Sequence, residues 1–396
     1  MTFRTLADAD LAGKRALVRV DFNVPMEDGT VSDDTRLRAA KPTIDKLRAG
    51  GAKVILLAHF DRPKGKVVPS MSLQAIVAPL SKVLGVPVAF ADDCIGQHAR
   101  DAVGTMQLGD VLLLENVRFH AGEEANDRQF ADALAANGDL FVNDAFSAAH
   151  RAHASTEAIA RRLPAFAGEQ MRLELTALNA ALGHPERPVL GIVGGSKVST
   201  KLELLGHLVT KLDKLAIGGG MANTFLYAQG HDVGASYCEK ELADTARDII
   251  RLAGKNSCKL FLPVDIVVAE KMAPGAPARV RHIGHVDDDE RILDAGPETV
   301  ERLCRAMDNS KTLIWNGPLG VFEIPPFDKG TVAAARHAAR RAKAGKLVAV
   351  AGGGDTVAAL NAAGVSDDFT FVSTAGGAFL EWMEGKVLPG VAALNQ

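Results

Sequence analysis

Short runs of branched apolar residues alternate along the chain with longer segments whose apolar residues recur at helical spacing. In the first half, "ALVRV", "KVILLAH", "VLLLENV" and "DLFVNDA" predict strands, and segments such as "PTIDKLRAGG" and "DRQFADALAANG" predict helices. Pro42 suits the first turn of its helix, and Gly50 and Gly51 suit the helix end. Strands that alternate with helices predict a mainly parallel sheet covered on both faces.

The second half repeats this pattern with "PVLGIVGG", "KLAIGGG", "KLFLPVDIVV", "TLIWNGP", "LVAVAGGG" and "FTFVST". Between the halves, apolar residues follow a helical period and the segment closes with "GHPERP". The apolar positions of this segment are Leu173, Leu175, Leu178, Ala181 and Leu182. The pattern predicts an α/β fold class, with two doubly wound, Rossmann-like parallel-sheet domains facing a cleft. An interdomain helix at 171–187 joins residues 1–170 to a second domain at 188–377.

Length and composition agree with a two-domain globular protein. The chain has 396 residues, of which 47% are hydrophobic and 23% charged, and its formal net charge is −3. This near balance argues against a nucleic-acid partner, because such proteins usually carry a basic face. The four cysteines are scattered without metal-ligand spacing, and neither a signal peptide nor a membrane span is recognisable. We therefore expect a reduced, cytoplasmic protein with no membrane partner.

In open parallel sheets, ligands bind beyond the carboxyl ends of the strands, so the loops that follow the strands carry the candidate chemistry. In the first half these loops are cationic: "RVDFN", "AHFDRP", "ENVRF" and "AHRAHAS". Their candidate ligand-binding side chains are Asp21, Asn23, Arg36, His59, Arg62, Arg118, His150, Arg151 and His153. Guanidinium groups bind carboxylate and phosphate in bidentate fashion, so the set suits a small phosphorylated acid. Individually, the same residues also suit surface ion pairs and turn caps.

In the second half the loops are rich in glycine: "VGGSKVSTK", "IGGGMAN" and "AGGGDT". Glycine lets a ligand approach backbone N–H groups at helix N-termini, which suits a polyphosphate. No GxxxxGK[ST] or GxGxxG fingerprint is present in these loops, and each glycine pair alone also suits a tight turn.

Two lysines and an acid sharpen this prediction. If a helix begins near Ser196, Lys197 and Lys201 lie four residues apart on one helical face and oppose the helix dipole. A bound anion offsets that cost, although solvated lysines are the alternative. Asp355 suits a Mg²⁺ ion shared with phosphate oxygens, or else a helix N-cap.

The segment "LIWNGPLGVFEIPPF" adds candidate contacts to a nucleotide. Asn316 offers an amide to phosphate, Pro318 and Val321 offer an apolar surface to a base, and Glu323 offers a carboxylate to ribose hydroxyls. The alternative is an ordinary turn beside a buried Trp315.

With these residues identified, the chain resembles the phosphoglycerate kinase family along essentially its whole length. The motifs that carry the resemblance occur in family order and spacing. They are "RVDFNVP", "HFDRPKG", "LENVRFH", "VNDAFSAAHRAHAST", "GGSKVSTKL", "IGGGMANTF", "LPVDIVV", "WNGPLGVFE", "GGGDT" and "MEGKVLPG". Several are long and are rarely shared by unrelated proteins.

The resemblance implies a role for each matching residue. Positions that hold 3-phosphoglycerate correspond to Asp21, Phe22, Asn23, Arg36, His59, Phe60, Asp61, Arg62, Arg118 and Arg151. Nucleotide positions correspond to Lys201, Gly218, Gly219, Asn316, Pro318, Val321, Glu323, Gly353, Gly354, Asp355 and Thr356, with Asp355 at the Mg²⁺ site. The catalytic set corresponds to Arg36, Lys197, Gly376 and Gly377. The resemblance further implies a monomer whose residues 378–396 return to the first domain.

Two departures from the family pattern stand out. "HFDRP" replaces the usual "HLGRP", which places Asp61 beside the predicted anion site. Asp tolerates a left-handed backbone, so the loop shape is expected to persist while affinity for the acid changes. "STAGGAF" replaces "STGGGAS", which places Ala375 and Phe379 near the expected hinge; there we expect stiffer closure with catalysis retained.

The function that this resemblance implies is a phosphotransferase with a carboxyl group as acceptor. Its reversible reaction transfers the acyl phosphate of 1,3-bisphosphoglycerate to MgADP, which gives 3-phosphoglycerate and MgATP. The resemblance implies that the reaction proceeds by hinge closure, with charge stabilised by Lys, Arg and Mg²⁺. A nicotinamide-dependent dehydrogenase would share the sheets but lacks the dinucleotide fingerprint. A two-domain solute-binding protein would share the hinge but normally carries an export signal.

Overall fold

The computed structural model describes residues 3–395, which form two compact units. One contains the chain up to Leu175 together with the segment from Val387 onward, and the other is Thr176–Lys386. Residues 378–386, expected with the first domain, belong to the second unit. The reason is that helix α13 (Gly376–Met383) contacts α7 (Leu202–Leu208) and strand β16 (Val348–Gly352).

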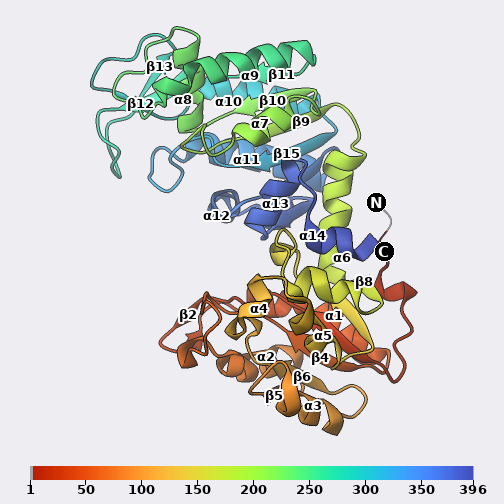
Figure 1. Ribbon diagram of the computed structural model, residues 1–396. Coiled ribbons are helices and arrows are strands. Elements are labelled where there is room, and N and C mark those ends of the chain that lie inside the picture. The colour runs from red at the N-terminus through yellow and green to blue at the C-terminus, as the bar shows by residue number, and fades with distance from the viewer. Residues whose placement is uncertain (1–2, 396) are drawn as a thin grey trace. The chain divides into compact units, whose positions relative to one another are not determined.

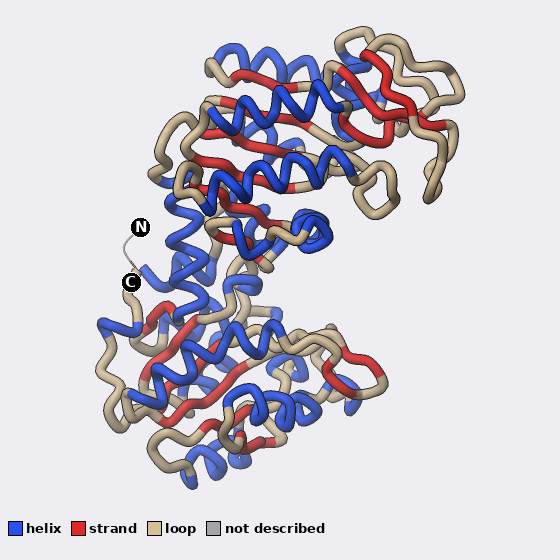
Figure 2. Tube along the Cα trace, turned by 180° about the vertical axis from the view of Figure 1, so that it is seen from behind, coloured by secondary structure: helices blue, strands red, loops and turns tan. Residues whose placement is uncertain are grey.

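The first unit is built on a six-stranded, entirely parallel sheet with the order β5-β6-β4-β1-β7-β8. Its strands are β1 (Arg15–Arg19), β4 (Lys53–Leu57), β5 (Val88–Ala91), β6 (Val111–Leu114), β7 (Leu140–Asn143) and β8 (Ala165–Ala167). Its helices are α1 (Thr35–Ala49), α2 (Val77–Leu84), α3 (Gly96–Thr105), α4 (Ala121–Glu124), α5 (Arg128–Ala135) and α14 (Pro389–Ala392). Helices lie on both faces of the sheet (Figures 1 and 2), so the central strands are buried almost throughout.

Two local features of this unit differ from expectation. Helix α1 begins at Thr35, so Pro42 lies inside it instead of in its first turn. A proline there lacks the N–H that would bond to the carbonyl one turn earlier, and the helix tolerates that loss. The helix does end at Ala49, before Gly50 and Gly51, as predicted.

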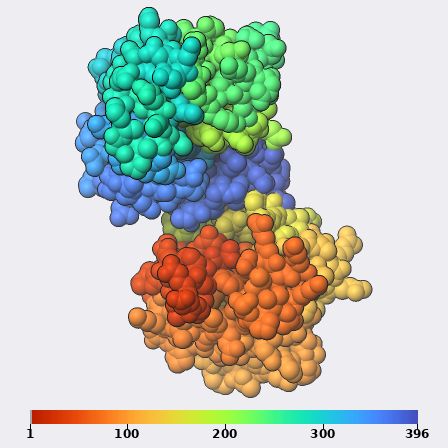
Figure 3. All heavy atoms as spheres, turned by 90° about the vertical axis from the view of Figure 1, so that its left-hand side faces the viewer, coloured from red at the N-terminus to blue at the C-terminus, as the bar shows by residue number. Residues whose placement is uncertain are grey.

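A hairpin of strands β2 (Met26–Glu27) and β3 (Thr30–Val31) was not predicted. It lies at the surface of the first unit (red spheres in Figure 3). Such short strands carry almost no periodicity, which is why the sequence pattern did not indicate them.

The second unit also has a six-stranded parallel sheet, with the order β11-β10-β9-β15-β16-β17. Its strands are β9 (Val189–Val193), β10 (Lys214–Ile217), β11 (Lys259–Phe261), β15 (Thr312–Asn316), β16 (Val348–Gly352) and β17 (Phe371–Ser373). Besides α7 and α13, its helices are α8 (Gly220–Ala228), α9 (Ala243–Lys255), α10 (Pro297–Asp308), α11 (Lys329–Lys343) and α12 (Gly354–Ala363). This strand order is that of a dinucleotide-type Rossmann sheet. The chain adds strands toward one edge of the sheet up to β11 and then returns to add β15 on the other side of β9, so the order reverses between β9 and β15.

A separate antiparallel sheet, with the order β13-β12-β14, is inserted into the second unit. Its strands are β12 (Asp265–Ala269), β13 (Arg279–His282) and β14 (Arg291–Ala295). The prediction of one strand across "KLFLPVDIVV" was wrong, because β11 ends at Phe261 and β12 starts a different sheet. Pro263 lies between them and has no N–H for a ladder. Residues between β12 and β13 lie at the surface shown in teal in Figure 3.

Helix α6 (Glu169–Leu178) crosses the boundary between the units and continues into a π-helical turn, Asn179–Gly183. Leu175, Leu178 and Ala181 of the predicted apolar stripe are buried, but Leu173 is 44% exposed. Within the described residues, no helix is both long and apolar enough to cross a membrane.

Candidate active site

In the first unit, the predicted acid-binding residues lie along one edge of the sheet. Strands β6, β4, β1 and β7 are neighbours and parallel, so the loops beyond their carboxyl ends are neighbours too. We call these loops the arginine edge, defined by Asp21–Asn23, Arg36, His59–Arg62, Arg118 and Arg151. The topology therefore gathers residues that are far apart in the sequence.

Asp21 and Arg36 form the first cluster of this edge. The Arg36 guanidinium donates to Asp21 Oδ1 at 3.0 Å and to the carbonyl of Asn23 at 2.8 Å. Ser147, beyond β7, donates to Asp21 Oδ2 at 2.5 Å. Arg36 is thus oriented by the loop that follows β1, while about a third of its side chain stays exposed to a ligand.

The loops beyond β4 and β6 form the second cluster. Asn116, which the sequence pattern did not indicate, makes two hydrogen bonds to the backbone of Phe60. Its Nδ2 donates to the Phe60 carbonyl, and its Oδ1 accepts the Phe60 N–H. Arg118 donates to the Asp61 carbonyl at 2.7 Å, and the Asp61 N–H donates to Asn23 Oδ1 at 2.9 Å. Asp61 has a φ of 53°, the left-handed conformation expected for this position.

The remaining predicted residues of this edge differ in exposure. Phe22 is fully buried in the core. Arg62 and Arg151 are exposed, and neither side chain donates a hydrogen bond within the described chain. Free guanidinium groups at the carboxyl edge of a sheet are available to an anion.

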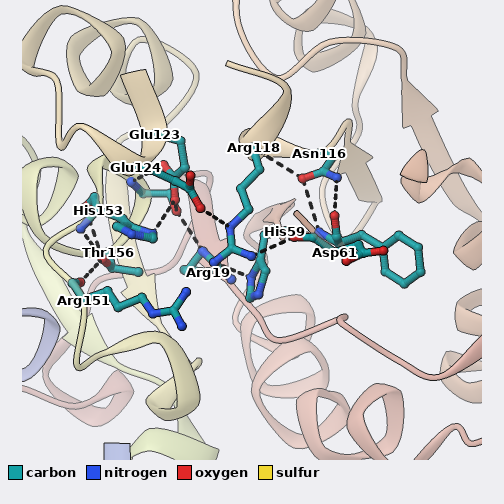
Figure 4. Close-up of polar contacts among 12 residues, drawn as sticks. Arg19, His59, Asp61, Asn116, Arg118, Glu123, Glu124, Arg151, His153 and Thr156 are labelled. Atoms are coloured by element: carbon teal, nitrogen blue, oxygen red, sulfur yellow. Dashed lines mark hydrogen bonds and ion pairs between the residues drawn. The ribbon is translucent and has the colours of Figure 1, made fainter. Parts of the chain in front are cut away.

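A buried polar network, which the sequence reasoning did not identify, lies beneath this edge (Figure 4). Arg19, Glu123 and His153 are 1%, 0% and 9% exposed, respectively. Burial and the nearby Arg118 and Arg19 lower the pKa of His153 to about 4. The signal for the network was present, since Arg19 is a charged residue inside the apolar run "ALVRV".

In the second unit, glycine-rich loops meet at the point where the strand order reverses. The turn at Gly194 beyond β9 and the turn at Pro318 beyond β15 touch through their backbones, and a Cβ on Gly194 would lie 1.8 Å from the Pro318 carbonyl oxygen. Gly219, with a φ of 65°, lies beside Gly218 and is the N-cap of α8. The N–H groups of Gly194, Gly218 and Gly219 donate to backbone carbonyls and hold these loops together at a topological switch point, where Rossmann sheets bind ligands.

The expected arrangement of Lys197 and Lys201 on one helical face is wrong. Helix α7 begins only at Leu202, with Lys201 as its N-cap, and Lys197 is an exposed loop residue. Lys201 Nζ instead donates to the Gly194 carbonyl and to Asn316 Oδ1, both at 2.6 Å. Burial lowers the pKa of Lys201 to about 8, whereas Asp355 acts in the opposite direction.

Two further helix N-termini lie close to this lysine. Gly353, with a φ of 98°, is the N-cap of α12, so Asp355 is inside the first helical turn and is not the cap. The Thr356 hydroxyl accepts the N–H of Gly317 at 2.6 Å, which ties α12 to the loop beyond β15. Helix α13 begins at Gly376 and Gly377, and a Cβ on Gly376 would be 3.9 Å from Gly353 and Gly354.

A cavity of about 710 Å³ opens among these elements. Of the predicted nucleotide residues, Gly219, Pro318, Val321, Glu323 and Asp355 line it. The others are in the adjoining segments: the end of β15, the start of α12 and the loops before α7, α8 and α12. They are Lys201, Gly218, Asn316, Gly353, Gly354 and Thr356. Its walls also include residues that the sequence reasoning missed, among them Asn223, Tyr237, Met272 and Asp294. A mostly apolar cavity of this size with a few polar groups is typical of a small-molecule site.

The residues present fit a Mg²⁺ ion bound together with phosphate. Asp355 is an exposed carboxylate on the cavity wall beside the glycine N-termini of α12 and α13. Mg²⁺ in proteins is commonly held by one or two carboxylates together with substrate phosphates. A single carboxylate beside two helix N-termini matches that pattern.

Comparisons with known proteins agree with this geometry. The phosphoglycerate kinase family model matches residues 6–386. Phosphoglycerate kinases of Caulobacter vibrioides (strain NA1000 / CB15N) and Rhizobium meliloti (strain 1021) are 71% and 60% identical, and each alignment covers 100% of both chains. The solved phosphoglycerate kinase of Coxiella burnetii superposes with a TM-score of 0.93 at 42% identity, covering 100% of this chain and 99% of that one. The Pyrococcus horikoshii OT3 enzyme gives 0.80 at 29%, covering 100% and 98%.

The two parallel-sheet units, the arginine edge and the glycine-lined cavity, taken with these relatives, define a two-domain α/β transferase. The chain belongs to the phosphoglycerate kinase family.

Proposed function

We propose that this chain catalyses the reversible transfer of a phosphoryl group between the carboxylate of 3-phosphoglycerate and ADP. In one direction, the acyl phosphate of 1,3-bisphosphoglycerate is passed to ADP, which releases 3-phosphoglycerate and forms ATP. The observation that supports the proposal is the presence of two chemically different surfaces suited to anions, one on each unit. The first offers guanidinium groups and the second offers helix N-termini around a cavity of about 710 Å³.

The acid would bind at the arginine edge. Backbone carbonyls already orient two of its guanidinium groups. Arg36 donates to the Asn23 carbonyl at 2.8 Å, and Arg118 donates to the Asp61 carbonyl at 2.7 Å. Such preorganised guanidinium groups bind carboxylate and phosphate without losing further side-chain freedom. The exposed Arg62 and Arg151 would supply flexible contacts to the same anion.

The nucleotide would bind in the cavity of the second unit. Its base would contact Pro318 and Val321, its ribose would contact Glu323, and its phosphates would face Gly353, Gly354 and Lys201. Asp355 would hold Mg²⁺, which neutralises phosphate charge and favours transfer. The backbone N–H groups at the α12 N-terminus favour the same negative charge.

Transfer itself requires charge stabilisation more than covalent chemistry from the protein. Arg36, the exposed Lys197 and the N–H groups of Gly376 and Gly377 would balance the charge on the moving group. Because the two sites belong to different units, hinge closure would bring the reacting oxygen and phosphorus together and exclude water.

A coupled assay with ATP, Mg²⁺ and 3-phosphoglycerate tests the proposal. Arg36→Ala is expected to lower kcat by orders of magnitude with little change in nucleotide affinity, and Asp355→Ala to abolish Mg²⁺-dependent turnover. Arg38→Ala is a matched control, because Arg38 pairs with Asp34 on the solvent side of α1. Tight ligand binding without turnover by the wild-type chain would contradict the proposal.

The expected monomeric state and cytoplasmic location also stay predictions. Light scattering coupled to size-exclusion chromatography at micromolar concentration tests the first, and a dimer mass would overturn it.

A further inference from the structure

A charged side chain at the end of β1 is held under the arginine edge in an unusually constrained position. Arg19 is 1% exposed and lies between Val18 and Val20, which are both fully buried. Arg19 and His59 lie side by side in Figure 4. A guanidinium buried in an apolar strand is costly unless every donor is satisfied.

Each side of the Arg19 guanidinium has one partner. Nε donates to Ser155 Oγ at 2.8 Å, Nη1 donates to the Val20 carbonyl at 2.5 Å, and Nη2 is 2.8 Å from Nδ1 of His59. A guanidinium has donors only and does not deprotonate in proteins. His59 Nδ1 must therefore accept, which places the single ring proton of His59 on Nε2.

A buried counter-charge fixes the orientation of Arg19. Ser155 donates from its hydroxyl to Glu123 Oε1 at 2.6 Å and from its N–H to Oε2 at 2.9 Å. Both oxygens of Glu123 thus accept hydrogen bonds, the pattern of an ionised carboxylate. Burial raises the pKa of Glu123, but Arg19 and Ser155 favour its charged form. The chain of contacts runs from Glu123 through Ser155 and Arg19 to His59.

Two arginines and a second histidine around His59 also oppose its protonation. They come from η4 (Val117–Phe119), which carries Arg118, and from the loop beyond β7, which carries Arg151 and His153. Burial and these neighbours, with Arg19, lower the pKa of His59 well below its ordinary value. A second proton on Nδ1 would also face an Arg19 N–H at 2.8 Å. Among the described residues, Nε2 has no hydrogen-bond partner, so its N–H is available to a ligand.

We propose that Arg19 is a positioning residue that keeps His59 neutral with its proton on Nε2, so that His59 offers one fixed N–H donor to the acid substrate. The proposal rests on the proposed function, since it assigns His59 to the same substrate. Arg19 does not touch that substrate. It acts by setting the tautomer of a neighbouring ring, and the donor it creates does not change across the neutral pH range.

Nitrogen NMR of the uniformly ¹⁵N-labelled protein without substrate tests the tautomer directly, with His59→Gln used to assign the ring signals. From pH 5 to pH 8, Nε2 is expected to keep the proton and Nδ1 to keep the shift of an acceptor. A proton on Nδ1, or a His59 ring that titrates in this interval, would overturn the proposal. This readout needs no turnover, so it can fail or succeed independently of the proposed reaction.

Steady-state kinetics of Arg19→Gln test the consequence for the substrate. KM for 3-phosphoglycerate is expected to rise about tenfold, in line with the loss of one hydrogen bond to a charged group, and to become pH-dependent between pH 5 and 8. KM for ATP should not change. Arg19→Lys, which keeps the charge and one donor nitrogen, is expected to restore part of the affinity.

Arg15→Gln is the matched control, because Arg15 lies on the same strand but pairs with Asp139 at the surface. Equal effects of Arg15→Gln and Arg19→Gln, or a pH-independent KM in folded Arg19→Gln, would contradict the role assigned to Arg19. If neither Arg19 variant folds, the wild-type tautomer measurement alone decides.

Discussion

At the scale of the residue, Lys201 shows how the fold prepares a cation for an anionic ligand. Its ammonium group donates to the Gly194 carbonyl and to the Asn316 side chain, both at 2.6 Å. Burial lowers its pKa to about 8, so a growing fraction of the lysine is neutral as the pH rises above neutrality. A nearby polyphosphate would favour the charged form and draw a proton onto Lys201.

Nucleotide affinity should therefore fall as the pH rises through about 8, because binding then requires proton uptake. Titration calorimetry with ATP in buffers of different ionisation enthalpy measures both the affinity and the proton uptake. Lys201→Met should bind more weakly and lose this pH dependence, whereas exposed Lys211→Met should behave as the wild type. An unchanged pH profile in Lys201→Met would contradict the assignment.

Asp61 is the second residue whose chemistry can be tested alone. It has a φ of 53° and is exposed in the loop beside Arg118. Asp61→Gly removes a negative charge next to the predicted anion site and keeps the left-handed backbone. We expect KM for 3-phosphoglycerate to fall severalfold at low salt, with less effect at high salt because screening weakens the repulsion. Asp28→Gly, at a left-handed position in the β2–β3 turn, is a backbone control that should leave KM unchanged.

At the scale of the element, the second unit places several helix N-termini around one crossing of two loops. The Gly194 turn beyond β9 contacts the Pro318 turn beyond β15 so closely that only glycine fits. Lys201, Asn316 and Thr356 then fix these loops to each other through hydrogen bonds. Residues of both loops, among them Gly195 and Pro318, line the cavity beside this crossing.

Gly194→Ala should consequently damage both stability and nucleotide binding. Its new Cβ would lie 1.8 Å from the Pro318 carbonyl oxygen, so the two backbones must separate. We expect a loss of about 1 to 3 kcal/mol in the free energy of unfolding, measured with urea, together with weaker ATP binding. Gly206→Ala, inside helix α7 with open space around it, is the control and should stabilise by up to about 1 kcal/mol. Wild-type ATP affinity in Gly194→Ala would show that the loop crossing does not shape the site.

At the scale of the whole molecule, each unit contains a buried aspartic acid whose raised pKa makes the stability of that unit depend on pH. Asp144 accepts the N–H groups of Gln170 and Met171 at the start of α6, and Asp294 accepts those of Ala295 and Gly330. Burial raises the pKa of each to about 7. Because the folded pKa is above the unfolded value of about 3.9, folding favours the protonated form. Their contribution to stability is fully present below pH 4 and is lost as the pH rises to about 7.

Asp144→Asn and Asp294→Asn should each remove this pH dependence from their own unit. Relative to the wild type, the free energy of unfolding of the affected unit should increase between pH 4 and pH 7 by an amount on the order of a few kcal/mol. Hydrogen exchange measured residue by residue is the suitable method, because two compact units need not unfold together. Asp34→Asn, at an exposed pair with Arg38, should leave the profile unchanged. A wild-type pH profile in either buried variant would place the titrating group elsewhere.

The sequence by itself determined the alternation of strands and helices and therefore the two parallel sheets. Parallel strands buried on both faces read as continuous apolar runs, so "ALVRV" and "LVAVAGGG" identified β1 and β16, and the glycines of the second run mark where its strand ends. The rule that ligands bind beyond the carboxyl ends of such strands directed attention to the segments that follow β1 and β16, which contain Arg36 and Asp355. Those inferences need only local patterns and short-range chemistry.

Only the tertiary structure decided which residues meet and in which state. Lys201 reaches Asn316 rather than lying along a helix with Lys197, because α7 starts later than the pattern predicted. Arg19 reads in sequence as one charge in an apolar strand, and its partners Ser155 and Glu123 are more than a hundred residues away. Burial, hydrogen-bond partners and pKa depend on those long-range contacts, and no local pattern in the chain encodes them.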